Sequence, residues 1–565
     1  MHALMMDEPL LLSTLLWRTE RLYHDKTIVT RVGPGQYHSY TYAEYGRRVR
    51  RLANALDALG VRQGDRVATL AWNHYRHFES YYAIPGMGAV LHTVNLRLFE
   101  AQQAFTINHA GSKVLIFDED QLPLVERIAA IGIPGVESYV IITDGALPET
   151  TLAPLYSYEE LLAAASPELE FPELDERSAA AICFTSATTG NPKAVVYSQR
   201  ALVLQSMALN MHNQLGIREQ ETWLAIAPMF HANAWCVPHA ALLAGATLVF
   251  AGVHPLGPDY IETIADQKVT GVNAVVTVGA MMRDYLLDGH DDIDISSLRL
   301  MWLAGQAPPR GLMDWWEQNR GVTVFTGYGM TESSPQVCFY SAKSSLSDSD
   351  PEAVWRRRTS GGMPIPLMRI KLTDESGAEL PWDGESLGTI MIRSPYTATG
   401  YLDDPRSATA LVDGWFDTGD LGIIDPDGYV TVKDRARDLI KSGGEWISSI
   451  DLENALMTHP RVREATVVSV PHEKWLERPL ACIVLDQPAS VGGAELRDFL
   501  QERFARWWLP DAFLFLEEIP KTSVGKFNKK LIRELIADDQ LAVLDSWTDR
   551  AEKIPGHPAP VANFI

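Results

Sequence analysis

Helix-like and strand-like segments alternate from Tyr40 to Arg320, and this alternation constrains the fold more than any other feature of the chain. Tyr42 to Leu59 carries apolar side chains at helical spacing and ends at Gly60, and the run Arg66 to Leu70 that follows has strand character. Strands alternating with helices favour an α/β fold on mostly parallel sheets. Further strands are expected at 113–117, 138–143, 271–276 and 298–303, with a helix at 122–131.

Length and composition predict more than one domain. At 565 residues the chain exceeds what one hydrophobic core supports. After about residue 360, turns rich in Gly, Pro and Asp separate short strands, which indicates a smaller β-rich subdomain. The charged run Asp434 to Asp438 is typical of a linker, and a small α+β domain is expected beyond it. The expected elements are strands at 368–372, 389–393, 428–432, 464–470 and 513–516, and helices at 452–458 and 494–504.

The charge balance restricts the partners. A formal net charge of −23 argues against a nucleic-acid or anionic-membrane surface, because either needs a basic face. The four cysteines are widely separated and form no metal-binding spacing, so neither disulfides nor zinc are implied. The N-terminus lacks the basic region of a signal peptide, and a cytoplasmic protein is expected.

One stretch, Ala234 to Val253, has the length and apolar character of a membrane span. Pro238 and Gly245 interrupt it, which favours a buried helix to Leu243, a turn and then a strand from Thr247. A true span is the alternative.

A hydroxyl-rich loop between Phe184 and Ala194 can hold a polyphosphate. Its hydroxyls, the backbone N–H groups around Gly190 and the Lys193 ammonium can converge on phosphate oxygens as charge-assisted donors. The β-branched and aromatic residues after Lys193 indicate a strand, whereas a Walker loop opens a helix. The alternative is an ordinary turn rich in Ser and Thr.

Two later segments carry groups suited to a nucleotide. Gly327 to Glu332 offers glycines for close backbone approach, an aromatic face for a base and a carboxylate for Mg²⁺. Asp420, held between turns, could chelate two ribose hydroxyls. The alternatives are a strand-end turn with a capping Thr/Glu for the first segment, and an Asx turn before Leu421 for the second.

A lysine near the C-terminus completes the set. In Pro520 to Lys526, Gly525 places Lys526 on a flexible, exposed turn, where it could serve as a mobile cation or belong to a solvated basic patch.

Taken in order, these segments resemble the signatures of the adenylate-forming superfamily, which includes acyl-CoA synthetases, peptide-synthetase adenylation domains and firefly-type luciferases. The resemblance covers residues 180 to 530. It implies an α/β fold: a large N-terminal adenylation domain (1–434) of α/β layers plus a β-rich subdomain, a hinge (435–437) and a small mobile α+β C-terminal domain (438–565). The family normally has glycine at Ala187 and Ala194 and often histidine at Gln199. An alanine methyl is tolerated where φ is negative.

The resemblance implies ATP, Mg²⁺ and coenzyme A as ligands and assigns site residues. It places Thr185, Ser186, Thr188, Thr189, Gly190 and Lys193 at the β- and γ-phosphates; Gly305, Gln306 and Ala307 in the adenine-side loop; Tyr328 and Gly329 at adenine; Thr331 at the α-phosphate; Glu332 at the metal; Asp420 and Arg435 at the ribose; Gly443, Gly444 and Trp446 at CoA; Arg437 at the hinge pivot; and Lys526 as the catalytic lysine of adenylation.

The sequences of residues 442–449 and 522–527 resemble those of the fatty-acid and short-to-medium-chain acyl-CoA synthetases. Within that branch the chain is similar to the methylmercaptopropionate-CoA ligases. The acid is then expected near His231 and Gly327. Trp235, one helical turn past His231, should fill the deep end of an acyl tunnel and favour a short acid, unless it is ordinary core. A small carboxylic acid is the expected partner, and a homodimer is compatible with the sequence. The rival hypothesis is a non-catalytic nucleotide-binding protein, motivated by Ala187 and Ala194.

Overall fold

The computed structural model describes residues 4–185, 191–346, 350–435, 438–442, 445–472, 474–487, 491–522, 526–538 and 545–546. The chain divides into two compact units. The first comprises Met1–Gln306, Trp315–Ile370 and Ile392–Asp417, and the second comprises Ala307–Asp314, Lys371–Met391 and Thr418–Ile565.

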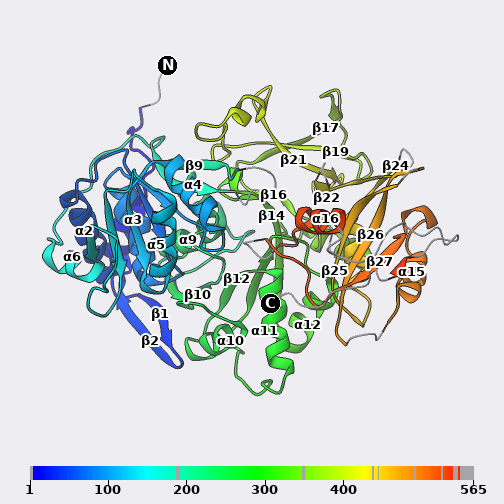
Figure 1. The fold of residues 1–565 in the computed structure, drawn as a ribbon, viewed down its shortest axis with the longest axis horizontal. Helices are drawn as coiled ribbons and strands as arrows, with labels where there is room; N and C mark the ends of the chain where they lie inside the picture. The colour runs from blue at the N-terminus through cyan, green and yellow to red at the C-terminus, as the bar shows by residue number, and fades with distance from the viewer. Residues whose placement is uncertain are drawn as a thin grey trace. The chain divides into compact units, whose positions relative to one another are not determined.

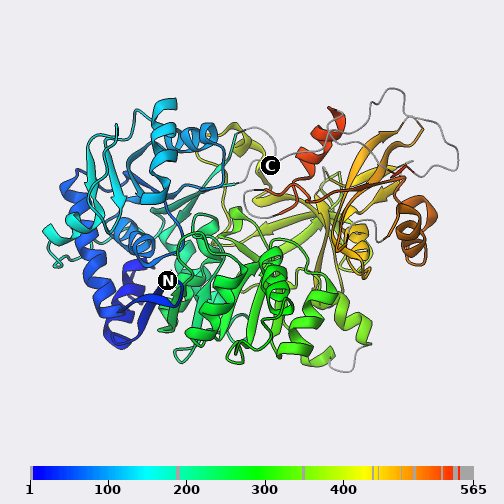
Figure 2. The ribbon, with the colours of Figure 1, turned by 60° about the horizontal axis from the view of Figure 1, so that its bottom comes forward.

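Two large sheets form the first unit, with its helices, drawn from blue to green, arranged around them (Figure 1, Figure 2). Most neighbouring strands are parallel, as the alternation of elements predicts. One sheet has the order β16 (Met363–Pro364), β15 (Gln336–Phe339), β14 (Thr323–Gly329), β13 (Leu300–Ala304), β12 (Gly271–Val275), β10 (Thr222–Ala225), β11 (Thr247–Phe250), β1 (Thr27–Gly33), β2 (Gln36–Thr41). The other has the order β7 (Leu155–Ser157), β6 (Ser138–Ile142), β5 (Ser112–Asp118), β3 (Arg66–Leu70), β4 (Val90–Thr93), β8 (Ala179–Phe184), β9 (Ala194–Ser198).

Local chemistry explains these elements. The Thr41 side chain accepts the Glu44 N–H at 3.2 Å and caps α2 at its start. In β5 the continuous apolar run Val114 to Phe117 is buried, as expected for an inner strand of a parallel sheet covered on both faces. These burial patterns place the core of the first unit between sheets and helices.

Two smaller sheets follow. The first has the order β18 (Glu379–Leu380), β17 (Arg369–Thr373), β19 (Gly388–Arg393), β21 (Trp415–Ile424), β20 (Leu411–Val412), with β22 (Val430–Arg435) beside β21. The C-terminal sheet has the order β24 (Glu445–Ile447), β23 (Ile440–Ser442), β26 (Leu476–Leu485), β27 (Ala512–Phe515), β28 (Asp545–Ser546), with β25 (Val462–His472) beside β26. These sheets confirm the predicted β-rich region and the α+β character of the C-terminal part.

The helices complete the layers. They are α1 (Leu12–Leu22), α2 (Tyr42–Ala58), α3 (Tyr75–Gly86), α4 (Glu100–Ala110), α5 (Leu122–Ile131), α6 (Tyr158–Ala164), α7 (Gln199–Leu209), α8 (Ala232–Trp235), α9 (Val237–Ala244), α10 (Gly257–Asp266), α11 (Val276–Leu287), α12 (Arg310–Arg320), α13 (Pro351–Arg358), α14 (Ser449–Leu456), α15 (Gly493–Gln501) and α16 (Lys529–Ala537).

Some boundaries differ from the sequence predictions. The helix expected at 452–458 begins earlier, at Ser449, because the Ser448 hydroxyl accepts the Asp451 N–H at 3.1 Å and caps it. The stretch at 234–253 forms α9, a left-handed Gly245 and β11, which confirms the helix, turn and strand. Among the residues that the structure describes, none of the helices has both the length and the apolar character needed to cross a membrane.

Candidate active site

The phosphate-loop segment is held by an antiparallel strand pair. β8 and β9 pair through Phe184 and Ala194, and the Thr185 N–H donates to the Lys193 carbonyl at 2.9 Å. This confirms a strand before the segment and a strand after Lys193, whereas a Walker loop is followed by a helix. Ala194 begins β9 as an extended residue, so its methyl causes no left-handed strain. Of the candidate residues here, Ser186, Thr188, Thr189 and Gly190, together with Ala187, lie outside the described residues.

Lys193 and Glu332 meet through a tyrosine that the motifs did not single out. The Tyr401 hydroxyl donates to Glu332 Oε1 at 2.8 Å and lies 3.3 Å from Lys193 Nζ. The Lys193 ammonium lies 4.4 Å from the centre of the Tyr401 ring. Burial, then the neighbouring Glu332 charge, raises the pKa of Tyr401 well above its usual range, so its hydroxyl stays a donor. The expected phosphate cation and metal carboxylate therefore lie on either side of one tyrosine.

Backbone contacts fix this cluster. The Tyr197 hydroxyl of β9 donates to the Thr331 carbonyl at 2.8 Å, and the Ala398 N–H donates to the Glu332 carbonyl at 2.8 Å. The Leu402 N–H donates to the Ala194 carbonyl at 3.0 Å. Three chain segments far apart in sequence thus hold Thr331 and Glu332 beside the strand that follows Lys193.

The segment 327–332 is less of a turn than expected. β14 continues through Gly329 and pairs with β15, and only Thr331–Ser333 forms a short 3-10 turn. A side chain at Gly329 would place its Cβ 2.3 Å from the Pro335 carbonyl oxygen, so the packing of two strands already requires glycine there. Gly327 and Tyr328 lie in the same strand, paired with Phe339 and Cys338.

Gly305 and Gln306 follow β13 directly, and Gly305 adopts a left-handed φ of 96°. Ala307 opens a short segment that groups with the second unit. The expected adenine-side loop is thus a strand-end turn.

Asp420 and Arg435 are neighbours in the second unit. They face each other across the β21 and β22 pair, with Arg435 Nε 3.5 Å from Asp420 Oδ1. Asp420 is therefore a strand residue rather than part of the expected turn, because pairing with β22 overrides the local effect of Gly419 and Gly422. The structure brings together the two residues expected at the ribose.

The C-terminal lysine is expected on a flexible, exposed turn, but the Lys526 side chain is only partly exposed, and residues 523–525 before it lie outside the described residues. The Lys521 and Phe527 backbones form a bridge, and the Thr522 N–H donates to the Lys526 carbonyl at 2.6 Å. Trp446 of β24 is half exposed, with the Lys441 ammonium 4.9 Å from its ring centre. Gly443, Gly444 and the expected pivot Arg437 lie outside the described residues.

The segment expected near the acid has an unusual backbone. Ala232 to Cys236 all have positive φ, from 45° to 59°, so the right-handed turn expected between His231 and Trp235 is not formed. Left-handed non-glycine residues cost free energy, and such strain gathers at functional sites. Trp235 is buried and packs edge to face on Trp302 with ring centres 4.9 Å apart.

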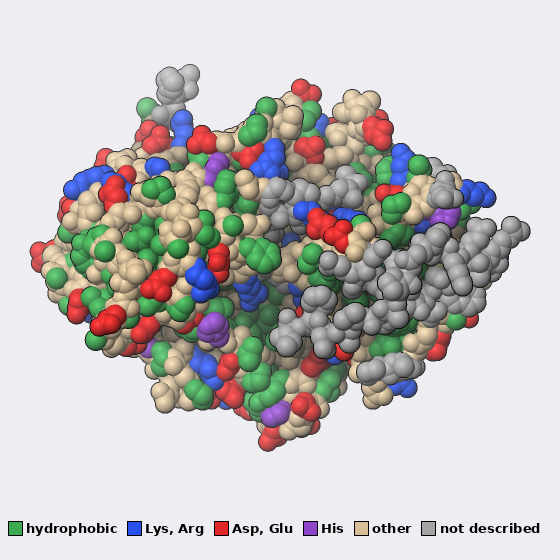
Figure 3. Space-filling model, viewed as in Figure 1, with side chains coloured by type: hydrophobic (Ala, Val, Ile, Leu, Met, Phe, Trp, Pro, Cys, Tyr) green, Lys and Arg blue, Asp and Glu red, His purple; other side chains and the backbone are tan. Residues whose placement is uncertain are grey.

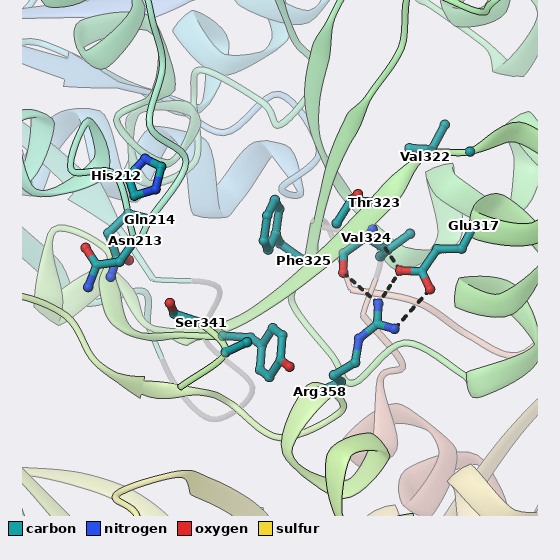
Figure 4. Close-up of a pocket in the computed structure, with 13 residues that line it drawn as sticks. His212, Asn213, Gln214, Glu317, Val322, Thr323, Val324, Phe325, Ser341 and Arg358 are labelled. Atoms are coloured by element: carbon teal, nitrogen blue, oxygen red, sulfur yellow. Dashed lines mark hydrogen bonds and ion pairs between the residues drawn. The ribbon is translucent and has the colours of Figure 1, made fainter. Parts of the chain in front are cut away.

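An aromatic row continues from Trp235 to a cavity. Trp302 contacts Phe339 and Phe339 contacts Phe325, with ring centres 5.8 and 5.4 Å apart. Phe325 lines a cavity of about 570 Å³ whose other walls are largely polar (Figure 4). The Glu317 and Arg358 ion pair crosses one wall, with a contact of 2.9 Å. The aromatic row thus separates Trp235 from this cavity.

Gln199 has a packing role. Its side chain accepts the Leu12 N–H at 3.1 Å and donates to the Pro85 carbonyl at 2.8 Å, which fastens the start of α1 to the end of α3. It is 1% exposed, so it acts within the core of the first unit.

The donors of the first unit fit a magnesium phosphate group, because a buried carboxylate oxygen of Glu332 suits Mg²⁺ and the Lys193 ammonium suits phosphate oxygens. In the second unit, the Asp420 carboxylate by itself suits ribose hydroxyls. Acidic and basic side chains are interspersed over the described part of the face drawn in Figure 3.

Comparisons with known proteins agree with this chemistry. The model of the family AMP-binding enzyme matches residues 16–402, and that of the AMP-binding enzyme C-terminal domain matches residues 451–526. The long-chain-fatty-acid–CoA ligase of Thermus thermophilus is 45% identical over 534 residues, covering 94% of this chain and 96% of that protein. The 3-methylmercaptopropionyl-CoA ligase of Ruegeria pomeroyi is 36% identical over 538 residues, covering 94% and 98%. The crystal structure of the anthranilate CoA ligase AuaEII with anthranoyl-AMP aligns with a TM-score of 0.84 at 26% identity, covering 94% and 99%.

The chain therefore belongs to the AMP-binding enzyme family, the adenylate-forming enzymes. Within that family its relatives place it among the AMP-forming acyl-CoA ligases, which use ATP, Mg²⁺ and CoA.

Proposed function

We propose that this enzyme is an acid–CoA ligase that activates a short- or medium-chain carboxylic acid in two half-reactions. In the first, a carboxylate oxygen attacks the α-phosphorus of ATP, the α–β phosphoanhydride bond breaks and pyrophosphate leaves. In the second, the CoA sulfur attacks the acyl carbon, the bond to AMP breaks and the thiol proton goes to solvent. The observation that carries the proposal is the contact of Lys193 and Glu332 through Tyr401.

Lys193 and Thr185, with the hydroxyls of the loop between them, would hold the β- and γ-phosphates. Glu332 would hold Mg²⁺, which neutralises phosphate charge when bound. Thr331 would contact the α-phosphate, Tyr328 the adenine, and Asp420 with Arg435 the ribose. Lys526 would stabilise the charge that builds between the attacking carboxylate and the α-phosphate.

The C-terminal domain, after the proposed hinge at 435–437, would then turn so that Lys526 leaves. Gly443 and Gly444 would let the pantetheine arm pass close to the backbone, and Trp446 would lie beside it. The half-exposed ring of Trp446 supports this role because it is accessible to a ligand.

The short acid is supported by the aromatic row. Trp235 lies four residues after His231, which would contact the acyl carboxylate, and its buried ring packs edge to face on Trp302. The 3-methylmercaptopropionyl-CoA ligases among the relatives support 3-methylmercaptopropionate as one candidate. The 45% identical relative is named for long-chain fatty acids, and a long-chain preference is the competing outcome.

The test is AMP release by the purified enzyme with ATP, Mg²⁺ and CoA over a panel from acetate to palmitate that includes 3-methylmercaptopropionate. A maximum among short and medium acids supports the proposal, and a maximum at palmitate overturns its chain length. ATP binding without AMP release from any acid would support a non-catalytic nucleotide-binding protein.

A further inference from the structure

A buried cluster of charges surrounds Lys529 in the second unit. Lys529 begins α16, three residues after Lys526. Its Nζ lies 2.8 Å from Glu453 Oε1 and also donates to the Ser449 hydroxyl. The side chains of Lys529 and Glu453 are only 11% and 9% exposed. A buried ammonium is stable only with such partners, so this lysine is tied to its surroundings.

Asp434 reaches the same cluster from the end of β22. Its Oδ2 accepts the Ser449 N–H at 3.0 Å and the Ser449 hydroxyl. Burial raises the pKa of Asp434 and of Glu453. Desolvation acts to lower the pKa of Lys529, yet the Glu453 and Asp434 carboxylates raise it. One ammonium therefore serves the buried carboxylates of Glu453 and Asp434, and the neighbouring Asp438 carboxylate also raises its pKa.

The members of the cluster stand on both sides of the proposed hinge at 435–437. Ser449, Glu453 and Lys529 follow it in the chain, and Glu453 is also fixed to β25 because its Oε1 accepts the Thr466 hydroxyl and the Val467 N–H at 2.8 and 2.7 Å. Asp434 precedes it. A rotation about the hinge would keep Ser449, Glu453 and Lys529 together. It would have to break the two hydrogen bonds between Asp434 and Ser449.

The same contacts bring two parts of the adenylation chemistry into one body. The described residues on either side of 523–525 are anchored, by Lys521 to Glu464 at 2.8 Å and by Lys529 to Glu453. Arg435, next to Asp434, faces Asp420 across β21 and β22. α16 packs on β25, and α14, which carries Ser449 and Glu453, packs on β22; the labels of α16, β22 and β25 are close in Figure 1. While Asp434 stays docked, the proposed ribose pair and Lys529 keep a fixed relation.

We propose that Asp434, Ser449 and Lys529 form a hinge latch that holds the arrangement used for adenylation and opens for thioester formation. Lys529 is its positioning residue. This inference rests on the proposed function, because it assumes two half-reactions and a hinge.

The test compares Asp434→Asn with Asp511→Asn. Asp511 is the matched control because its partner Arg478, 2.6 Å away, also lies after the hinge, so that pair is not broken by rotation. Asp434→Asn should slow acid-dependent pyrophosphate exchange about tenfold, the effect of losing a charged hydrogen bond. Its rate of thioester formation from supplied acyl-AMP should be unchanged or higher, and Asp511→Asn should keep the wild-type ratio of the two rates.

Ser449→Ala removes the hydroxyl that joins the Asp434 carboxylate to the Lys529 ammonium. It should also slow pyrophosphate exchange and leave thioester formation unchanged, which keeps the test valid if Asp434→Asn folds poorly. Lys529→Arg should restore part of the exchange rate that Lys529→Met loses. Equal loss in both half-reactions for Asp434→Asn and Ser449→Ala overturns the latch, and so does a loss confined to pyrophosphate exchange in Asp511→Asn. A wild-type enzyme inactive in both half-reactions would instead refute the proposed function.

Discussion

Replacing Tyr401 by Phe tests the proposed pairing of Lys193, as the phosphate cation, with Glu332, as the metal carboxylate. The change removes one hydroxyl and keeps the ring that covers Lys193. Glu332, 6% exposed, then loses a hydrogen bond of 2.8 Å. A hydrogen bond to a charged group contributes about 1.5–3 kcal/mol, which corresponds to about 10- to 150-fold in an equilibrium constant. Loss of a partner that orients a metal ligand costs about 10- to 100-fold in metal affinity, so the two values agree.

The assay is acid-dependent pyrophosphate exchange at fixed ATP over a range of Mg²⁺ concentrations. The Mg²⁺ needed for half-maximal rate should rise about 10- to 100-fold in Tyr401→Phe, while the KM for the acid stays unchanged. Tyr42→Phe is the matched control, since its buried hydroxyl donates at 2.7 Å to the Ala246 carbonyl. An unchanged Mg²⁺ requirement in Tyr401→Phe, or an equal rise in the control, would refute the role assigned to Glu332.

Two further predictions concern the acid and the pH dependence of stability. Trp235→Ala should raise kcat/KM by about 50-fold for acids that are about three methylene groups longer, at about 0.8 kcal/mol per buried methylene. Trp235→Phe should leave kcat/KM for these acids unchanged. Steady-state kinetics over the acid panel measure both, and an unchanged chain-length optimum in Trp235→Ala would mean that Trp235 is ordinary core. Burial lowers the pKa of His77 to about 4 and those of His92 and His239 to about 3. Because unfolded histidines take up protons near pH 6.5, the unfolding free energy should fall as pH drops from about 6.5 toward 4, by about 1.4 kcal/mol per pH unit for each such histidine. Urea titrations should show a shallower fall in His239→Gln, and an identical slope would contradict the neutral buried state.

The sequence predicts many strands of the large sheets because they depend on local signals. The alternation of elements from residue 40 to residue 320 is strong enough to locate β3, β5, β6 and β12. The residues after Lys193 also predict the strand β9, and the structure places Asp420 beside Arg435, two residues that the motifs assign to the same ligand.

Long-range contacts account for what sequence reasoning missed. Tyr401 belongs to no motif, and only the folding of three distant segments brings it to Lys193 and Glu332. Asp420 lies in a strand because β22 pairs with β21, although the nearby glycines indicate a turn. The left-handed backbone from Ala232 to Cys236 has no sequence signal, because alanine and tryptophan rarely adopt positive φ.

The central claim is that one lysine serves only the first of two half-reactions, and Lys526→Ala tests it most directly. The variant and the wild type should be compared in acid-dependent pyrophosphate exchange and in thioester formation from supplied acyl-AMP and CoA. We expect exchange to fall by at least about 100-fold, as when a group that stabilises transition-state charge is removed, and thioester formation to stay close to the wild-type rate. An equal loss in both half-reactions would contradict the account.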